Sequence, residues 1–165
     1  RYIGDWSSDV CSSDLNFLKD LVNKTPDVKF DLYGIDKVQP IWADHYFKTI
    51  SNAKMGLNLS RGEAIKYYSS DRITQIVGNG LVCLIDEKTK YRNFFDENEM
   101  VFYKNTNDLS EKILKISSDD KLRKKIAKRG KLKYMKYFNS TIVADFIINK
   151  TFNINHKKKY LWYRP

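Results

Sequence analysis

The chain has 165 residues, a mean hydropathy of −0.57 and a formal net charge of +10. It contains no run of 18 or more apolar residues, so the sequence predicts no transmembrane helix. Of its two cysteines, Cys11 falls in an unusual opening segment and Cys83 in an apolar run. We therefore expect no disulfide partner and a reducing environment, with the protein cytoplasmic or peripheral at the inner membrane.

The opening segment, residues 1–15, has no apolar period and no continuous apolar stretch of the kind a signal peptide needs. Its run DWSSDVCSSDL matches the translation of a common sequencing adapter. We interpret residues 1–15 as a non-native adapter translation, exclude them from the fold, and expect the native N-terminus to be missing. The segment carries one arginine and three aspartates, so its removal raises the net charge from +10 to about +12.

Residues 16–152 alternate between strand-like and helix-like patterns, and a basic, aromatic tail follows over 153–165. In chain order, the patterns predict strands over 28–35, 54–60, 81–86 and 100–105, helices over 44–53, 70–80, 107–118, 119–138 and 140–152, and a helical turn over 90–95. Gly80 is expected to close its helix, Asn107 and Ser140 to begin theirs, and Asp119 and Asp120 to cap the longest.

Strands and helices alternating at this spacing predict an α/β fold, a Rossmann-like parallel sheet with helices on both faces. Such sheets bind ligands beyond the carboxyl ends of their strands. The turns after Gly34, Ser60 and Asp86 are therefore the candidate positions for a site.

The turn after Ser60 has the composition of an anion site. Ser69, Ser70 and Asp71 open a helix, whose first N–H groups and dipole attract negative charge. Arg61 and Arg72 flank it and could hold a diphosphate. The alternative is that the serines only cap the helix. Because a cation in the first turn opposes the helix dipole, Arg72 needs a partner, which is either an anion or a carboxylate such as Glu63 or Asp86.

Four stretches carry a family resemblance: GLNLSRG (56–62), SSDRITQIVGNGLVCLID (69–86), FFDENEMVFYKNTNDLSEKI (94–113) and KLRKKIAKRGKLKY (121–134). In this order they resemble the C-terminal domain of GT-B glycosyltransferases, of the CgeB-like or glycosyl transferases group 1 type. The resemblance covers residues from about 28 to 150.

The resemblance implies sugar transfer from a nucleotide-sugar donor without a metal or other cofactor, this half binding the donor and an N-terminal domain binding the acceptor. The fragment alone is expected to be inactive, and no catalytic residue is named. A Glu of the family that contacts the donor ribose falls at Gln75, which accepts hydrogen bonds more weakly than a carboxylate. The implied donor-binding residues are Ser60, Arg61, Ser69, Ser70, Asp71, Arg72 and Gln75.

Two other functions fit some of the same residues. A basic nucleic-acid-binding module would explain the nine Lys and Arg residues of 121–138, although a charged helix is more often a solvated face. A non-catalytic nucleotide-sugar-binding domain would explain Gln75. The pair Asp44 and His45 could be catalytic, but a lone histidine at a helix start is more often structural. No metal site is predicted.

Overall fold

The structure is a computed structural model that describes residues 2–5, 12–34, 37–59, 64–68, 71–154 and 160–163. Within these ranges, five parallel strands form one sheet in the order β2-β1-β3-β4-β5. The strands are β1 (Tyr2–Asp5), β2 (Phe30–Tyr33), β3 (Met55–Asn58), β4 (Val82–Asp86) and β5 (Val101–Tyr103). The helices are α1 (Ser12–Lys24), α2 (Ala43–Asn52), α3 (Asp71–Gly78), α4 (Thr106–Ser118), α5 (Asp120–Tyr137) and α6 (Ser140–Thr151), with 3₁₀ turns at Glu87–Thr89 and Tyr91–Asn93.

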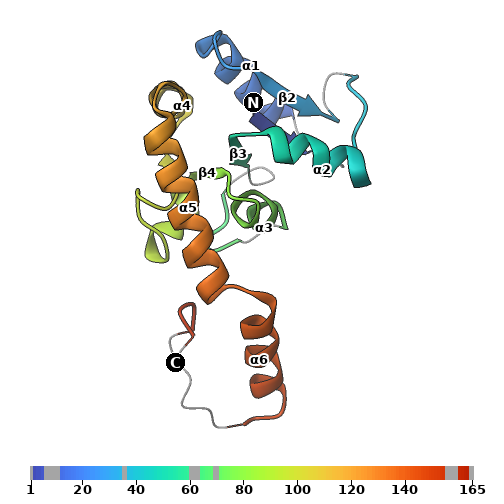
Figure 1. Ribbon diagram of the computed structural model, residues 1–165, viewed down its shortest axis with the longest axis vertical. Coiled ribbons are helices and arrows are strands. Elements are labelled where there is room, and N and C mark those ends of the chain that lie inside the picture. The colour runs from blue at the N-terminus through green and yellow to red at the C-terminus, as the bar shows by residue number, and fades with distance from the viewer. Residues whose placement is uncertain are drawn as a thin grey trace.

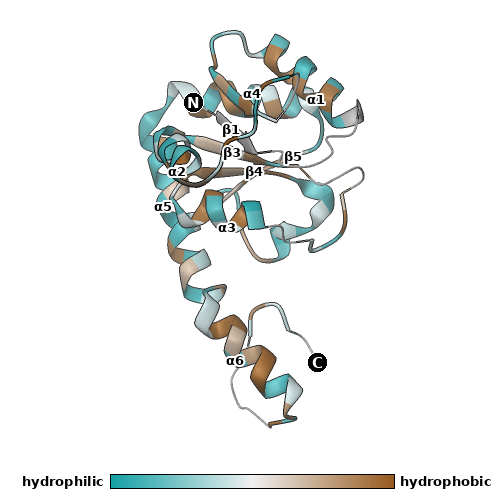
Figure 2. Cartoon of the chain, turned by 90° about the vertical axis from the view of Figure 1, so that its right-hand side faces the viewer, coloured by the Kyte–Doolittle hydropathy of each residue, from teal (hydrophilic) through white to brown (hydrophobic). Residues whose placement is uncertain are grey.

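Helices cover both faces of this sheet, which confirms the predicted Rossmann-like α/β class. Figure 2 shows α1 and α4 on one face and α2 and α3 on the other. The side chains of β4 alternate between the two layers: Leu84 joins the core under α1 and α4, whereas Cys83 and Ile85 join the core over α2 and α3. Both faces of β4 are buried, as its continuous apolar run predicts.

The turn from α3 into β4 is closed by Gly80, as predicted. Gly80 has a φ of +77°, a conformation that favours glycine, and its N–H donates to the Val77 carbonyl at 3.0 Å. The N–H of Leu81 donates to the Ile76 carbonyl at 3.1 Å. These two bonds form a Schellman motif, which satisfies the last carbonyls of α3 and turns the chain directly into the sheet.

The longest helix, α5, begins as the sequence indicates, with Asp119 accepting from the Leu122 N–H at 2.9 Å. The predicted cap of α4 is wrong by two residues. Asn105 rather than Asn107 is the N-cap and accepts from the Asp108 N–H at 3.0 Å. The backbone of Asn105 is extended as the chain leaves β5, which is the conformation an N-cap requires.

The predicted cap of α6 is also displaced, by one residue. Asn139 has an extended backbone and accepts from the Ile142 N–H at 3.0 Å, so Ser140 is already the first residue of the helix. Asparagine and serine are equally good caps, and the choice follows from where α5 ends at Tyr137.

The first part of the chain differs from the sequence-based expectation. Tyr2–Asp5 forms β1, which pairs in parallel with β2 on one side and β3 on the other, so this part of the opening segment belongs to the sheet. The sequence analysis also missed α1, although Leu18 and Leu21, one helical turn apart, are fully buried against α4 and the sheet. The origin of residues 1–15 in a laboratory sequence stays a prediction.

At the other end of the chain, α5 passes the edge of the sheet where β4 and β5 begin, and it ends at α6, away from the sheet (Figure 1). The Thr74 and Tyr134 hydroxyls, 2.8 Å apart, connect α3 to α5. Part of the tail folds back on α6, with Tyr160 buried and Trp162 half-buried. The segment Tyr160–Tyr163 is therefore packed against α6.

Candidate functional site

The strand order identifies the edge at which a parallel sheet of this kind binds ligands. The connection from β1 to β2 runs through α1 on one face, and the connection from β2 to β3 runs through α2 on the other. Strand β2 lies on one side of β1, and β3, β4 and β5 follow on the other side, so the strand order reverses between β1 and β3. Doubly wound sheets open a crevice at such a point, beyond the carboxyl ends of the strands. The turn after β3, which contains most of the predicted site, begins at this position.

At the end of β3, Arg72 connects the strand to the start of α3. Its Nη1 donates to the Leu59 carbonyl at 2.9 Å, and the side chain is half-buried. The Leu59 carbonyl is therefore a partner of this cation in the first turn of α3, besides the anion and the carboxylates that the sequence suggests.

The two other described members of the predicted site contact each other. Gln75 Nε2 donates to Asp71 Oδ2 at 2.6 Å, one turn apart on α3. Asp71 is exposed and Gln75 is half-buried. The amide nitrogen is therefore engaged, which leaves the amide oxygen as the group that could accept a hydrogen bond from a ligand.

The remaining predicted residues, Ser60, Arg61, Ser69 and Ser70, lie outside the described residues, as does Glu63. The structure thus brings together Asp71, Arg72 and Gln75 at the amino end of α3, beside the carboxyl end of β3. The other proposed partner of Arg72, Asp86, caps the 3₁₀ turn that follows β4, with its Oδ1 accepting from the Lys88 N–H at 2.8 Å.

The turn after β3 is attached to the segment after β4 through Tyr67. The Tyr67 N–H donates to the Thr89 carbonyl at 2.8 Å, its hydroxyl accepts from Asn93 Nδ2, and its ring lies 5.1 Å from that of Phe94. Tyr67 has a φ of +61°, which is strained for a side chain of this size. The predicted turns after Ser60 and after Asp86 are therefore joined into one surface, which no pattern in the sequence indicates.

Asp44 and His45, the possible catalytic pair, lie at the start of α2. Both residues are exposed at the start of α2, and the His45 ring makes an edge contact with Tyr33, at 6.2 Å between centroids. His156 lies outside the described residues. Within the described ranges, no three His, Cys, Asp or Glu side chains are grouped as metal ligands.

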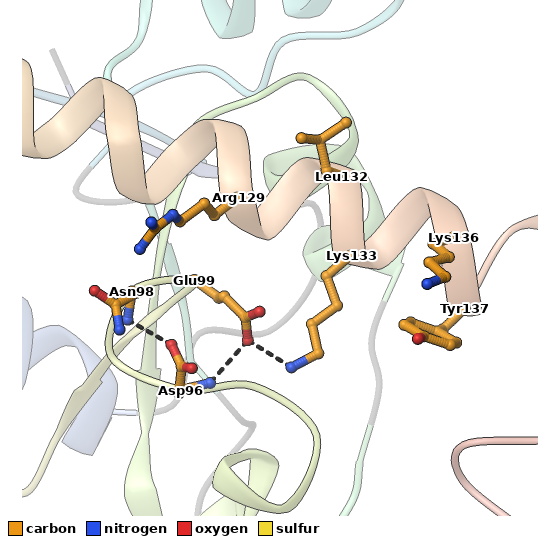
Figure 3. A pocket seen from close by; sticks show the side chains of 8 residues that line it. All are labelled: Asp96, Asn98, Glu99, Arg129, Leu132, Lys133, Lys136 and Tyr137. Carbon is orange, nitrogen blue, oxygen red and sulfur yellow. Dashed lines mark hydrogen bonds and ion pairs between the residues drawn. The ribbon is translucent and has the colours of Figure 1, made fainter.

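A groove between the 96–99 turn and α5 lies at the opposite edge of the sheet (Figure 3). The 96–99 turn directly precedes β5, so the groove lies at the amino ends of the strands. Glu99 Oε2 accepts from Lys133 Nζ at 2.6 Å and from the Asp96 N–H at 3.0 Å. These internal bonds join the turn to α5, which makes the groove a structural junction, remote from the candidate site.

A doubly wound parallel sheet with helices on both faces defines a Rossmann-like α/β domain. The sequence model of the glycosyl transferase-like family matches residues 14–149, and the chain belongs to this family. A search of curated proteins returned no match. Family membership supports glycosyl transfer as the reaction class. No described helix is both long and apolar enough to cross a bilayer.

Proposed function

We propose that this chain is the donor-binding, C-terminal half of a GT-B-type glycosyltransferase of the CgeB-like group. It holds the diphosphate and nucleoside of a nucleotide sugar, while an N-terminal domain binds the acceptor. Family membership supports the reaction class, and the resemblance of residues 56–62 and 69–86 supports the assignment of this half. The observation that carries the proposal is the position of Arg72, at the amino end of α3 and bonded to the carbonyl of Leu59, the first residue after β3.

Physical reasons support a diphosphate at this position. The amino end of α3 presents N–H groups and the positive end of the helix dipole. The Arg72 guanidinium, whose Nη1 donates to Leu59, adds a delocalised positive charge at the same helix end. The same bond fixes the guanidinium in place, so less side-chain entropy is lost when an anion binds.

The nucleoside would then extend toward Gln75, whose amide oxygen accepts from a ribose hydroxyl. The bond from Gln75 Nε2 to Asp71 orients that amide along the helix surface. The anion contacts proposed for Ser60, Arg61, Ser69 and Ser70 follow from the resemblance. Catalytic groups would come from the acceptor-binding domain, so this half alone binds donor without transferring sugar.

The test is a calorimetric titration of the chain with UDP, GDP and ADP, each with and without EDTA. We expect at least one nucleotide to bind equally well with the chelator, and the Arg72→Lys variant to bind it about tenfold more weakly because Lys loses the planar fork. Arg129→Lys is the matched control, since Arg129 is an exposed arginine at the opposite edge. Loss of binding with EDTA would contradict the metal-independent proposal.

The rival nucleic-acid function rests on the basic residues of α5. Some of these already have acidic partners: Lys133 pairs with Glu99 at 2.6 Å and Arg123 with Asp120 at 3.0 Å. Tight, strongly salt-dependent binding to single-stranded nucleic acid, together with failure of every nucleotide, would favour that rival. Nucleotide binding without transfer in the full-length parent protein would favour the non-catalytic alternative.

A further inference from the structure

Tyr67 has a backbone conformation that a tyrosine rarely adopts. It has a φ of +61° and is the third residue of a turn in which the Tyr68 N–H donates to the Ile65 carbonyl at 3.2 Å. A positive φ at this position of a turn favours glycine, because a side chain crowds the backbone there. The observed conformation therefore persists only where contacts from outside the turn stabilise it.

The stabilising contacts come from the segment that follows β4. The Tyr67 N–H donates to the Thr89 carbonyl at 2.8 Å. Thr89 is fully buried, and its Oγ1 donates at 2.6 Å to the carbonyl of Asp86, the last residue of β4. This contact therefore fixes the backbone of Tyr67 to the end of the strand. At the other end of the side chain, Asn93 Nδ2 donates to the Tyr67 hydroxyl from the second 3₁₀ turn.

The ring of Tyr67 packs on Phe94, which the core holds in place. The Phe94 ring centroid lies 5.1 Å from that of Tyr67, 5.9 Å from that of Tyr91 and 6.0 Å from that of Phe138. Tyr91 is buried in the core over α2 and α3, and Phe138 is the residue at which α5 ends. The position of Phe94 is therefore set by contacts that do not involve the turn before α3.

We propose that Asn93 is a positioning residue for donor binding, which acts through Tyr67 on the turn before α3. The inference rests on the proposed function, because it concerns the binding of the same nucleotide sugar. Tyr67 lies four residues before Asp71, the first residue of α3, so a fixed Tyr67 limits where the chain can enter the helix. Fixing this entry before the ligand arrives reduces the conformational entropy that is lost when the ligand binds.

Two other roles for Asn93 make different predictions. If its bond to Tyr67 only stabilised the fold, its loss would lower the Tm, yet Asn93 and Tyr67 are both exposed, where a single substitution changes stability little. If Asn93 contacted the nucleotide directly, removal of the Tyr67 hydroxyl would leave the affinity unchanged. A positioning role predicts that the two side chains act as a pair, so that loss of either one has the same effect.

The test is a calorimetric titration of the full chain and its variants with UDP, GDP and ADP. We expect Asn93→Ala and Tyr67→Phe each to weaken binding of the preferred nucleotide about fivefold, the effect of one hydrogen bond. The double variant should bind no more weakly than either single variant. Asn98→Ala is the matched control, since Asn98 is an exposed asparagine beside the groove at the opposite edge of the sheet; its affinity should be unchanged.

A second measurement needs no nucleotide. Because the Tyr67 N–H donates to the Thr89 carbonyl, its hydrogen exchange reports how firmly the turn is held. We expect this amide to exchange about fivefold faster in Asn93→Ala and Tyr67→Phe than in the parent chain or in Asn98→Ala. The Tm of all these variants should equal that of the parent chain within error.

Several outcomes would overturn the positioning role of Asn93. These are an unchanged affinity or unchanged exchange in Asn93→Ala, additive losses of affinity in the double variant, and a lowered Tm that accounts for the weaker binding. If the parent chain binds a nucleotide and Asn93→Ala binds it equally well, only this inference fails. If the parent chain binds none of the three nucleotides, the proposed function fails, and the inference fails with it.

Discussion

Gly130 of α5 lies directly against the backbone of Glu99, in the turn before β5. A Cβ at Gly130 would lie 3.3 Å from the Glu99 carbonyl carbon and closer still to its oxygen. The absence of a side chain therefore sets how closely α5 approaches the edge of the sheet. The Glu99–Lys133 ion pair closes the same contact (Figure 3). This contact explains structurally why a glycine stands at position 130 of the family-like stretch 121–134.

We expect Gly130→Ala to lower the free energy of unfolding by about 1–3 kcal/mol, because backbone rather than a flexible side chain must move to admit the methyl group. Urea denaturation measures the change. The matched control is Gly78→Ala in α3, where the new Cβ would meet only the Met135 side chain, at 3.9 Å. The control should be neutral or stabilising by up to about 1 kcal/mol. Equal effects of the two substitutions would contradict the close approach.

Arg72→Ala should reduce the stability of the ligand-free protein by about 1–2 kcal/mol, because the Leu59 carbonyl loses a charged donor at a half-buried position. Urea denaturation without nucleotide measures it, and Arg129→Ala should stay within about 0.5 kcal/mol of the parent. An unchanged stability for Arg72→Ala would mean that the bond to Leu59 contributes little. Because Arg72 has this structural partner, affinity is better compared through Arg72→Lys.

Deletion of residues 1–11 should lower the Tm by roughly 4 °C or more, since it removes β1 from between β2 and β3 and leaves two unpaired strand edges. Differential scanning calorimetry measures the shift. Replacing Tyr2–Asp5 by a Gly-Ser stretch of equal length controls for chain length and should have a similar effect. An unchanged Tm would show that β1 contributes nothing, as expected for a non-native segment.

Alkaline pH should destabilise the fold through Cys83 and Tyr103. Burial raises the pKa of the Cys83 thiol from 9.0 to about 12, and burial, followed by nearby Asp86, raises the pKa of Tyr103 above its ordinary value of 10.0. The stabilisation that the neutral, buried Cys83 and Tyr103 side chains provide is fully present below the pKa values that these groups have in the unfolded chain. It falls as pH rises above 9, because the unfolded chain then releases protons that the folded chain retains.

Between about pH 8 and about pH 10.5, Cys83→Ala should lose roughly 2 kcal/mol less stability than the parent, since one titrating group is gone. Urea denaturation at the two pH values gives the difference, and Tyr103→Phe should flatten the dependence further above about pH 10. A parent protein with the same stability at both pH values would falsify this prediction.

Local signals explain the part of the fold that the sequence determined by itself. Gly80 closes α3 and Asp119 caps α5 through bonds that span no more than five residues. The continuous apolar run of β4 indicates burial on both faces of the strand from its own residues alone. Such features depend on backbone geometry and on periodicity, which are written in consecutive residues, so the parallel α/β class follows from their alternation.

Only the tertiary structure decided the contacts between distant segments. Tyr67 bonds to Asn93, Gly130 meets Glu99, and the guanidinium of Arg72 reaches the Leu59 carbonyl, across 26, 31 and 13 residues. Each depends on how far a helix or turn is displaced along the sheet, which no local pattern encodes. The same holds for β1, because pairing between β2 and β3 supplies backbone hydrogen bonds to a four-residue segment whose own sequence shows no strand period.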